Sequence, residues 1–279
     1  MPQLTEGRAV IVTGAGGGIG RAEALEFARQ GASVVVNDLG DAAVDVVAEI
    51  QALGGTAVAN SEDVSDWDGA KRLIDAAVNA FGRLDVLVNN AGILRDRMLV
   101  NMAPEEWDDV IKVHLRGTFA PSRHAAAYWR ECSKSGQQVD ARIINTSSAA
   151  GLYGNLGQAN YAAAKAGIAA LTIVAAEELG RYGITVNAIA PAALTRMTEG
   201  LRERSDEEKA QMAPENIAPL VVWLGSAESA DITGRLFNVK GGWLSVAEGW
   251  VSGPEADNGT RWAPAQLSDV VPSLVAKSY

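Results

Sequence analysis

The hydrophobic residues of this chain follow two periodicities in alternation. Short continuous runs of Val, Ile, Leu and Ala, such as those at 9–14 and 33–38, are typical of buried strands. Each run is followed by a segment with apolar residues at helical spacing, such as 21–31 and 42–55, and both of these end at glycine. This pairing of strand and helix continues to about residue 242.

Strands that are apolar throughout, each followed by a helix, predict a parallel sheet covered by helices on both faces. We therefore expect an α/β fold with a Rossmann-like, doubly wound sheet of about seven strands in a three-layer αβα arrangement. A long helical region at 104–132 has a possible bend at Gly117 or Pro121. Further strands are expected within 56–64, 84–92, 141–148, 184–191 and 234–243, and further helices at 67–82 and 160–180.

The regular pattern predicts a single catalytic domain over residues 1–250. The segment at about 194–215 interrupts the pattern with charged residues, and we expect it to form a lid over the substrate. Residues 251–279 are rich in Pro, Gly and Ser and less periodic. We expect them to form a tail that packs on the domain or on a neighbouring subunit.

Composition narrows the class of protein. The 279 residues are 48 % hydrophobic and carry a net charge of −10, which argues against a nucleic-acid partner. The only cysteine, Cys132, cannot form an intramolecular disulfide, so we expect a reducing, cytoplasmic environment. Two histidines and one cysteine make a metal site improbable. The apolar runs are far shorter than a membrane span, so we expect no membrane partner.

A glycine-rich turn follows the first strand and opens the first helix. It reads T-G-x-x-x-G-x-G from Thr13 to Gly20. Positions without side chains let the backbone approach a pyrophosphate, and a helix N-terminus offers N–H groups to the anion. The pattern predicts a dinucleotide site. Its expected contacts are Gly14, Gly16, Gly18, Ile19 and Gly20.

Three further strand ends point to the same site. Asp38 follows the second strand, where a carboxylate can accept both ribose hydroxyls and would repel a 2′-phosphate, so we expect NAD rather than NADP. Asp63 and Val64, after the third strand, are expected near adenine. The fourth strand ends in Asn89–Gly92, and we expect Asn90, Ala91 and Gly92 at the same crevice.

Tyr161 and Lys165 stand four residues apart, hence on one face of a helix rich in alanine. A tyrosine needs its pKa lowered by roughly 3 units to exchange protons near neutrality, or about 4 kcal/mol. An ammonium about 4 Å away supplies about that much at an effective dielectric near 20. The pair suits acid/base chemistry on an alcohol or a carbonyl. Ser148, thirteen residues earlier, offers a hydroxyl to the substrate oxygen, with Ser147 as the competing choice.

Taken together, these motifs resemble the short-chain dehydrogenase/reductase family over roughly residues 5–245. TGxxxGIG, NNAG, the serine-to-tyrosine spacing, YxxxK, NAIAP and ITGRLFNVKGG carry the resemblance. It implies reversible hydride transfer, with Tyr161 as acid/base and Ser148 orienting the substrate oxygen. Lys165 would lower the tyrosine pKa and hold the nicotinamide ribose.

The chain departs from that family pattern at two places. His114 stands where most members have asparagine, so it either replaces the asparagine in a proton relay or simply packs. Pro191-Ala192 replaces the usual Pro-Gly, and the following threonine is displaced to Thr195. Pro191 and Thr195 are the expected contacts with the nicotinamide amide.

A narrower resemblance concerns the substrate. VVVNDLG, NNAGILRDRML, VHLRGTF, GLYGNLGQANYAAAK, APLVVWL and GGW are similar to the (3R)-hydroxyacyl-CoA dehydrogenase unit of peroxisomal multifunctional enzymes of type 2. This implies NAD-dependent oxidation of a (3R)-3-hydroxyacyl-CoA to the 3-ketoacyl-CoA. A 17β-hydroxysteroid or other secondary-alcohol dehydrogenase is the alternative, and a non-catalytic dinucleotide sensor is the remote one. Family resemblance also implies a homodimer or homotetramer paired through the helices at 104–132 and 161–180.

Overall fold

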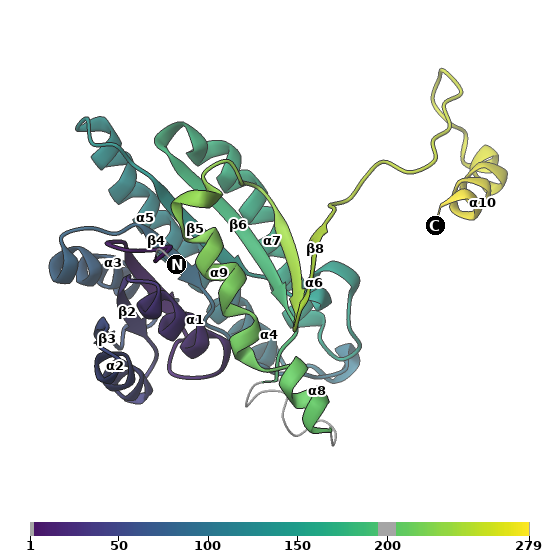
Figure 1. Ribbon diagram of the computed structural model, residues 1–279. Helices are drawn as coiled ribbons and strands as arrows, with labels where there is room; N and C mark the ends of the chain where they lie inside the picture. The colour runs from purple at the N-terminus through teal and green to yellow at the C-terminus, as the bar shows by residue number, and fades with distance from the viewer. Residues whose placement is uncertain (1–2, 195–204, 279) are drawn as a thin grey trace. The chain divides into compact units, whose positions relative to one another are not determined.

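The computed structural model describes residues 3–194 and 205–278. One sheet runs through the larger unit in the strand order β3-β2-β1-β4-β5-β6-β7-β8 (Figure 1). The chain divides into two compact units, Met1–Ala247 and Glu248–Tyr279. The strands are β1 (Ala9–Thr13), β2 (Ser33–Asn37), β3 (Thr56–Asn60), β4 (Val86–Asn89), β5 (Ala141–Thr146), β6 (Ile184–Pro191), β7 (Leu236–Lys240) and β8 (Trp243–Ala247).

Helices connect the parallel strands, as the sequence pattern predicts. Within the larger unit they are α1 (Gly18–Arg29), α2 (Ala42–Ala52), α3 (Trp67–Phe81), α4 (Pro104–Val110), α5 (Gly117–Lys134), α6 (Ala149–Tyr153), α7 (Ala159–Leu179), α8 (Asp206–Gln211) and α9 (Ala218–Leu224). A π-helical segment, η2 (Ile111–Arg116), joins α4 to α5 directly before Gly117, whereas Pro121 lies inside α5. The smaller unit contains α10 (Leu267–Lys277).

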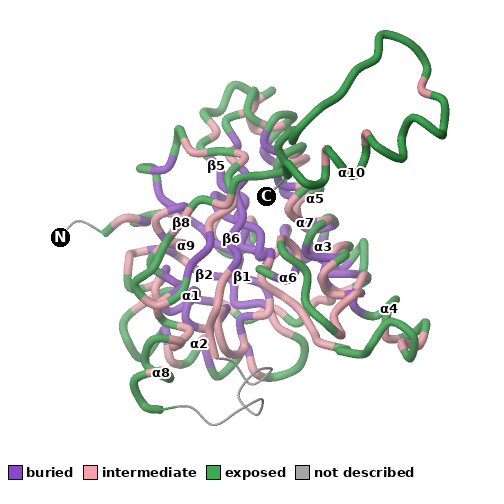
Figure 2. The backbone as a smooth tube through the Cα atoms, turned by 90° about the vertical axis from the view of Figure 1, so that its right-hand side faces the viewer, coloured by how far each residue is buried: buried purple, intermediate pink, exposed green. Residues whose placement is uncertain are grey.

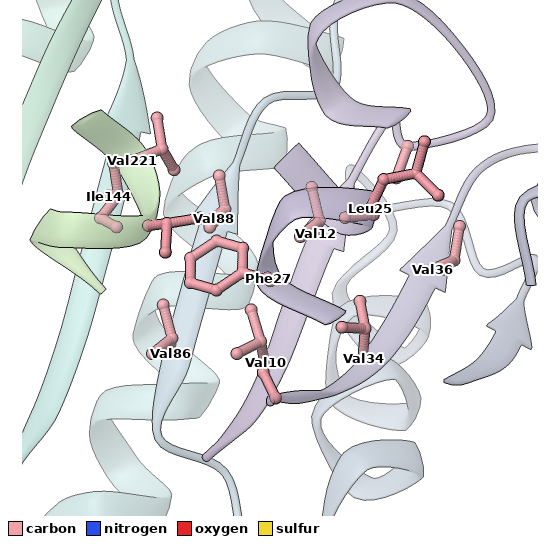
Figure 3. Packing of buried hydrophobic residues seen from close by; sticks show 14 of the residues in the cluster. Val10, Val12, Leu25, Phe27, Val34, Val36, Val86, Val88, Ile144 and Val221 are labelled. Carbon is pink, nitrogen blue, oxygen red and sulfur yellow. The ribbon is translucent and has the colours of Figure 1, made fainter. Parts of the chain in front are cut away.

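Alternate residues of each central strand serve two separate cores. Val10 and Val12 of β1 face the cluster that includes Phe27 of α1 and Val221 of α9 (Figure 3). Ile11 faces the opposite cluster, formed with α3 and α5. All five are fully buried, and burying a side chain of this size stabilises the fold by about 2 kcal/mol. Figure 2 shows the buried residues concentrated along the strands. The expected three-layer α/β fold is confirmed.

The strand order places a ligand crevice. β1 pairs with β2 on one side and with β4 on the other, and all three are parallel. The order in which strands are added to the sheet therefore reverses between β1 and β4, and the connections after these two strands run to opposite sides. In open α/β sheets, ligands bind at such a switch point. The glycine-rich turn follows β1 and the Asn89–Gly92 segment follows β4, so both reach this crevice.

The sheet has one strand more than the expected seven. β8 pairs with β7 in antiparallel register, with Lys240 opposite Trp243. The two residues between the strands are Gly241 and Gly242, and Gly241 has φ = +53°, which suits a tight hairpin. The expectation of a single last strand over 234–243 is therefore wrong, although a Gly-Gly pair between two apolar runs is itself a hairpin signal.

One helix passes a length and hydropathy criterion for a membrane span, although charged residues interrupt its apolar runs. Residues Ala159–Tyr182 have a mean hydropathy of 1.3 and are long and apolar enough to cross a bilayer, judged by length and composition. The same helix packs on β6 and β5 and carries Tyr161 and Lys165. Its alanines make it apolar all round, as expected of a helix that packs on neighbours from several sides.

Glu23 of α1 is fully buried, and neither carboxylate oxygen has a hydrogen-bond partner within the described residues. Burial raises the pKa of Glu23 to about 8. The folded protein therefore holds this proton up to about pH 8, whereas the unfolded chain releases it near its ordinary value of 4.5. The contribution of Glu23 to the free energy of unfolding is therefore fully present below pH 4.5 and is lost as the pH rises through about 8.

We therefore expect Glu23→Gln to raise the free energy of unfolding by about 2 kcal/mol at pH 9 and to change it little at pH 5. The glutamine cannot ionise, although its buried amide offsets part of the gain. Urea unfolding at both pH values measures the effect. Glu26→Gln, one turn along on a more exposed side chain, is the control. Equal stability of the variant and the parent protein at pH 9 would contradict the prediction.

Candidate active site

Asn90 and Thr13 fix the backbone of the glycine-rich turn through hydrogen bonds. The Asn90 side-chain amide donates to the carbonyls of Thr13 and Gly14, at 2.9 and 3.2 Å. The Thr13 hydroxyl accepts the backbone N–H groups of Asn90 and Ala91. Gly14 has φ = +63°, and a Cβ on Gly20 would lie 2.4 Å from the Gly14 carbonyl oxygen. Close backbone packing therefore requires glycine at both positions.

Asp38 lies at the carboxyl end of β2, next to this turn. Its Oδ2 accepts the Gly16 N–H at 2.8 Å, and a Cβ on Gly16 would come within 2.8 Å of the same oxygen. The carboxylate is thus positioned by the turn itself. Asp38 also lines a cavity, where its carboxylate can accept hydrogen bonds from hydroxyl groups.

A cavity of about 520 Å³ opens at the carboxyl ends of β1, β2 and β4. It suits a small-molecule cofactor in size and in its glycine-rich floor. Burial alone would raise the pKa of Asp63, but hydrogen bonds from Ser65 and the charge of Lys112 outweigh burial and lower it. The residues predicted to bind the cofactor that line this cavity are Gly14, Gly18, Ile19, Asp38, Asp63, Val64, Asn90, Ala91 and Gly92.

The structure distinguishes the two serines after β5. Ser147 is buried, and its hydroxyl donates to the Lys165 carbonyl at 2.9 Å. Ser148 begins α6, where its Oγ accepts the Ala150 N–H at 3.2 Å, and it hydrogen-bonds the Tyr161 side chain. Ser148 is therefore the serine whose hydroxyl faces the tyrosine, while Ser147 holds α7 to the strand.

Tyr161 and Lys165 lie in the first two turns of α7 and point to the end of β5. The Lys165 Nζ is 5.5 Å from the centre of the Tyr161 ring and donates to the Thr146 carbonyl at 2.5 Å. Burial lowers the pKa of Lys165 to about 7. Because this pKa lies near neutrality, the lysine can gain or lose a proton at physiological pH.

The direction of the tyrosine pKa differs from the expectation. Burial raises the pKa of Tyr161, the hydrogen bond with Ser148 lowers it in part, and the charge of Asp96 raises it further. Lys165 is not among the groups that shift the tyrosine pKa, and burial disfavours the charged form of the lysine itself. The pair alone therefore does not lower the tyrosine pKa. A bound oxidised nicotinamide would bring the further positive charge that this requires.

His114 lies between the tyrosine and the cavity. Its ring meets the Tyr161 ring edge-on, with centroids 5.1 Å apart. Its Nε2 lies 3.0 Å from the N–H and 2.7 Å from the carbonyl oxygen of Ile93, which lines the cavity. Tyr161 itself does not line the 520 Å³ cavity. The Tyr161 ring contacts the His114 ring, and His114 in turn contacts Ile93, which lines the cavity.

Asn160 is a site residue that the sequence motifs do not identify. It is fully buried, and its side-chain amide donates to the carbonyls of Arg95 and Glu106. Its Oδ1 accepts the Tyr161 N–H at 2.7 Å. Asn160 therefore joins the start of the tyrosine helix to the loop after β4 and to α4. Its position next to Tyr161 is the only sequence signal, and it does not reveal these distant partners.

The remaining predicted residues are less closely tied to the cavity. Pro191 ends β6, whereas Thr195 lies outside the described residues, as does much of the expected lid at about 194–215. Arg95 and Arg97 pair with Asp109 and Glu106 across distances of 3.6 and 3.0 Å. No cluster of three metal-binding side chains occurs in the described part of the chain.

Comparison with known proteins places this geometry in context. A family model described as short chain dehydrogenase matches residues 8–209. The hydroxyacyl-CoA dehydrogenase ChsB1 of Mycobacterium tuberculosis is 48 % identical over 94 % of this chain and 86 % of that protein. The peroxisomal multifunctional enzyme type 2 of Mus musculus is 48 % identical over 87 % of this chain, which spans 33 % of its length.

A solved structure agrees with these relatives. The crystal structure of a short chain dehydrogenase from Mycobacterium avium superposes with a TM-score of 0.93 and 61 % identity, covering 99 % of this chain and 97 % of that one. The fold and the sequence of this chain thus agree with a matched family model and with relatives of high identity. The chain belongs to the short-chain dehydrogenase family.

Proposed function

We propose that this protein is an NAD-dependent dehydrogenase that reversibly oxidises a (3R)-3-hydroxyacyl-CoA to the 3-ketoacyl-CoA. The observation that carries the proposal is the grouping of Ser148, Tyr161 and Lys165 after β5, with Tyr161 joined to the dinucleotide cavity through His114 and Ile93. It occurs in a chain 48 % identical, over most of its length, to a protein named hydroxyacyl-CoA dehydrogenase.

Each residue has a role that its position supports. Ser148 holds the oxygen on C3 of the substrate by a hydrogen bond, and the Tyr161 phenolic oxygen takes the hydroxyl proton during oxidation. Lys165, with a pKa of about 7, supplies positive charge beside the ring and can pass the proton onward. A bound NAD would supply the hydride acceptor for C3. Asp38 and the glycine-rich turn would hold its adenosine and pyrophosphate ends.

Apolar side chains beside the tyrosine support a hydrophobic substrate. Two segments meet where Arg97 and Gln158 pair, directly before α7, and the Arg97 N–H donates to the Gly157 carbonyl at 2.7 Å. Both segments carry large apolar side chains that are mostly exposed. These are Met98, Leu99, Val100, Tyr153 and Leu156. An acyl chain would remove such a surface from water, and exposed patches of this kind mark binding sites.

A steady-state assay with both enantiomers of a 3-hydroxyacyl-CoA and with NAD and NADP tests the proposal. We expect turnover of the (3R) thioester with NAD. Activity with only the (3S) thioester, or with only NADP, would contradict it. The same apolar surface fits a steroid, so a 17β-hydroxysteroid is included as a substrate. Preference for the steroid would assign the alternative function.

The preference for NAD depends on Asp38. We expect Asp38→Asn to lower kcat/KM with NAD by about 10- to 100-fold, because a carboxylate hydrogen bond to the ribose is lost. The same change removes repulsion of a 2′-phosphate, so the ratio of NAD to NADP activity falls as well. Asp41→Asn is the control, since Asp41 is exposed and its side chain does not cap α2. An unchanged cofactor ratio would refute the assignment.

Two features support assembly as a homodimer or homotetramer. A groove of about 570 Å³ between α5 and α7 is lined by residues including Phe119 and Leu171, and Ile173 and Val174 of α7 are about half exposed. A second subunit pairing through these helices would cover this surface. α10 also exposes Leu267, Val271 and Val275 at helical spacing, which the expected packing of residues 251–279 would cover. Sedimentation analysis reports the assembly state.

The single cysteine supports a cytoplasmic location.

A further inference from the structure

Three contacts define the position of His114, which stands where the family resemblance leads us to expect asparagine. It lies in the π-helical segment η2 and is 2 % exposed. Its Nε2 contacts the Ile93 backbone, and its ring edge meets Tyr161. A Cβ on Gly92 would lie 2.3 Å from the His114 Cε1, so the chain before Ile93 is packed tightly on the ring.

We propose that His114 is a positioning residue: its ring holds the Ile93 backbone and the Tyr161 ring apart at a set distance and carries no proton during turnover. The proposal rests on the proposed function, because it concerns the same tyrosine. π-helical turns inside longer helices often occur at functional sites, where they reorient a side chain. Here the segment turns the histidine toward the loop after β4 instead of along α5.

The hydrogen-bonding of the ring supports a fixed neutral state. Only Nε2 has a partner, and the buried Nδ1 has none among the described residues. A relay needs a proton path through both nitrogens, because a proton received at one must leave from the other. One of the two nitrogens has no such exit. The contact with the backbone of Ile93 resembles a structural anchor more closely than a link in a chain of proton carriers.

The electrostatic surroundings of His114 also favour the neutral form of its ring. Burial, together with a smaller contribution from the charge of Lys165, lowers the pKa of His114 to about 3, and the hydrogen bond with the Ile93 backbone opposes the shift. The ionisable groups facing the ring from α7 are Tyr161 and Lys165, and Asp96 acts on the tyrosine from the loop after Ile93. Its own segment contributes Lys112 and Arg116. The one charged side chain that shifts the pKa of His114 among the described residues is thus a cation, which disfavours an imidazolium at this position.

Histidine nitrogen NMR tests the proposal directly and does not depend on turnover. The chain contains two histidines, so ¹⁵N-histidine labelling with His124→Gln assigns the His114 signals. We expect the His114 ring to remain one neutral tautomer from pH 5 to 9, with and without NAD. Titration of the ring between pH 6 and 8 in either state would overturn the proposal. Because no substrate is involved, this result stands even if the thioester assignment fails.

Two variants add a kinetic readout. His114→Asn keeps a side-chain amide for the Ile93 backbone, and we expect it to retain kcat within about tenfold, with the limbs of the pH–rate profile unmoved. His114→Phe keeps a ring but loses the anchor, and we expect kcat to fall about 100-fold with a smaller change in KM, as for a misplaced reactive group.

The outcomes separate positioning from proton transfer. If His114→Phe retains the kcat of the parent protein, or if His114→Asn displaces a limb of the pH profile, the proposal is wrong. Circular dichroism and NAD binding verify that each variant is folded. If His114→Phe does not fold, the NMR titration and His114→Asn decide. Absence of turnover in the parent protein would instead count against the proposed function.

Discussion

Replacing Tyr161 with phenylalanine is expected to lower kcat by about 10³-fold, within the range assigned to a positioned general acid or base. The phenolic oxygen is the group placed to take the substrate proton, because Ser148 hydrogen-bonds it and Lys165 lies on the same helix face. The ring itself remains and keeps its edge contact with His114. We therefore expect NAD affinity and thermal stability to change little.

Steady-state kinetics with the most rapidly oxidised 3-hydroxyacyl-CoA measures the change in kcat. NAD titration measures the affinity for the cofactor. Tyr182→Phe removes a hydroxyl from a partly buried tyrosine of the second core cluster, far along the chain from Ser148, and serves as the control. Retention of more than a tenth of the parent kcat by Tyr161→Phe would show that another group handles the proton. Equal losses in the two variants would point to a general effect of removing a tyrosine hydroxyl.

Gly20→Ala is expected to destabilise the fold by about 2–3 kcal/mol and to weaken NAD binding by about 30-fold. The added Cβ would lie 2.4 Å from the Gly14 carbonyl oxygen and 2.5 Å from the Asn90 amide nitrogen. Overpacking against atoms that cannot retreat carries a penalty of this size. Displacement of Asn90 also breaks its two hydrogen bonds to the turn, each worth about 1 kcal/mol.

Calorimetric titration with NAD and thermal unfolding report the two effects separately. Gly180→Ala is the matched control, because a Cβ there meets no described atom within 4 Å and the backbone is helical, with φ = −53°. We expect that variant to be neutral or slightly stabilised. If Gly20→Ala bound NAD within threefold of the parent and unfolded at the same temperature as Gly180→Ala, the turn would not have the proposed role.

Local patterns suffice to predict the architecture. Continuous apolar strands followed by helices of 3.6-residue period imply a parallel sheet covered on both faces, and the structure has this arrangement. The strand-turn-helix context of Gly14–Gly20 and the spacing of Tyr161 and Lys165 are also short-range features. Such signals are readable because a strand or helix repeats its geometry every few residues. The extra strand β8 was not predicted, although the Gly241-Gly242 pair before it is a local hairpin signal.

Long-range packing decides what the local pattern leaves open. Ser147 and Ser148 are equivalent in the sequence, and only the packing of α7 on β5 commits the Ser147 hydroxyl to Lys165. The directions of the pKa shifts of Tyr161 and Glu23 depend on burial by residues distant in the sequence. The chain alone thus specifies the sheet, the turn and the reactive side chains. Tertiary packing sets their solvation and partners, because desolvation and hydrogen bonding depend on neighbours in space.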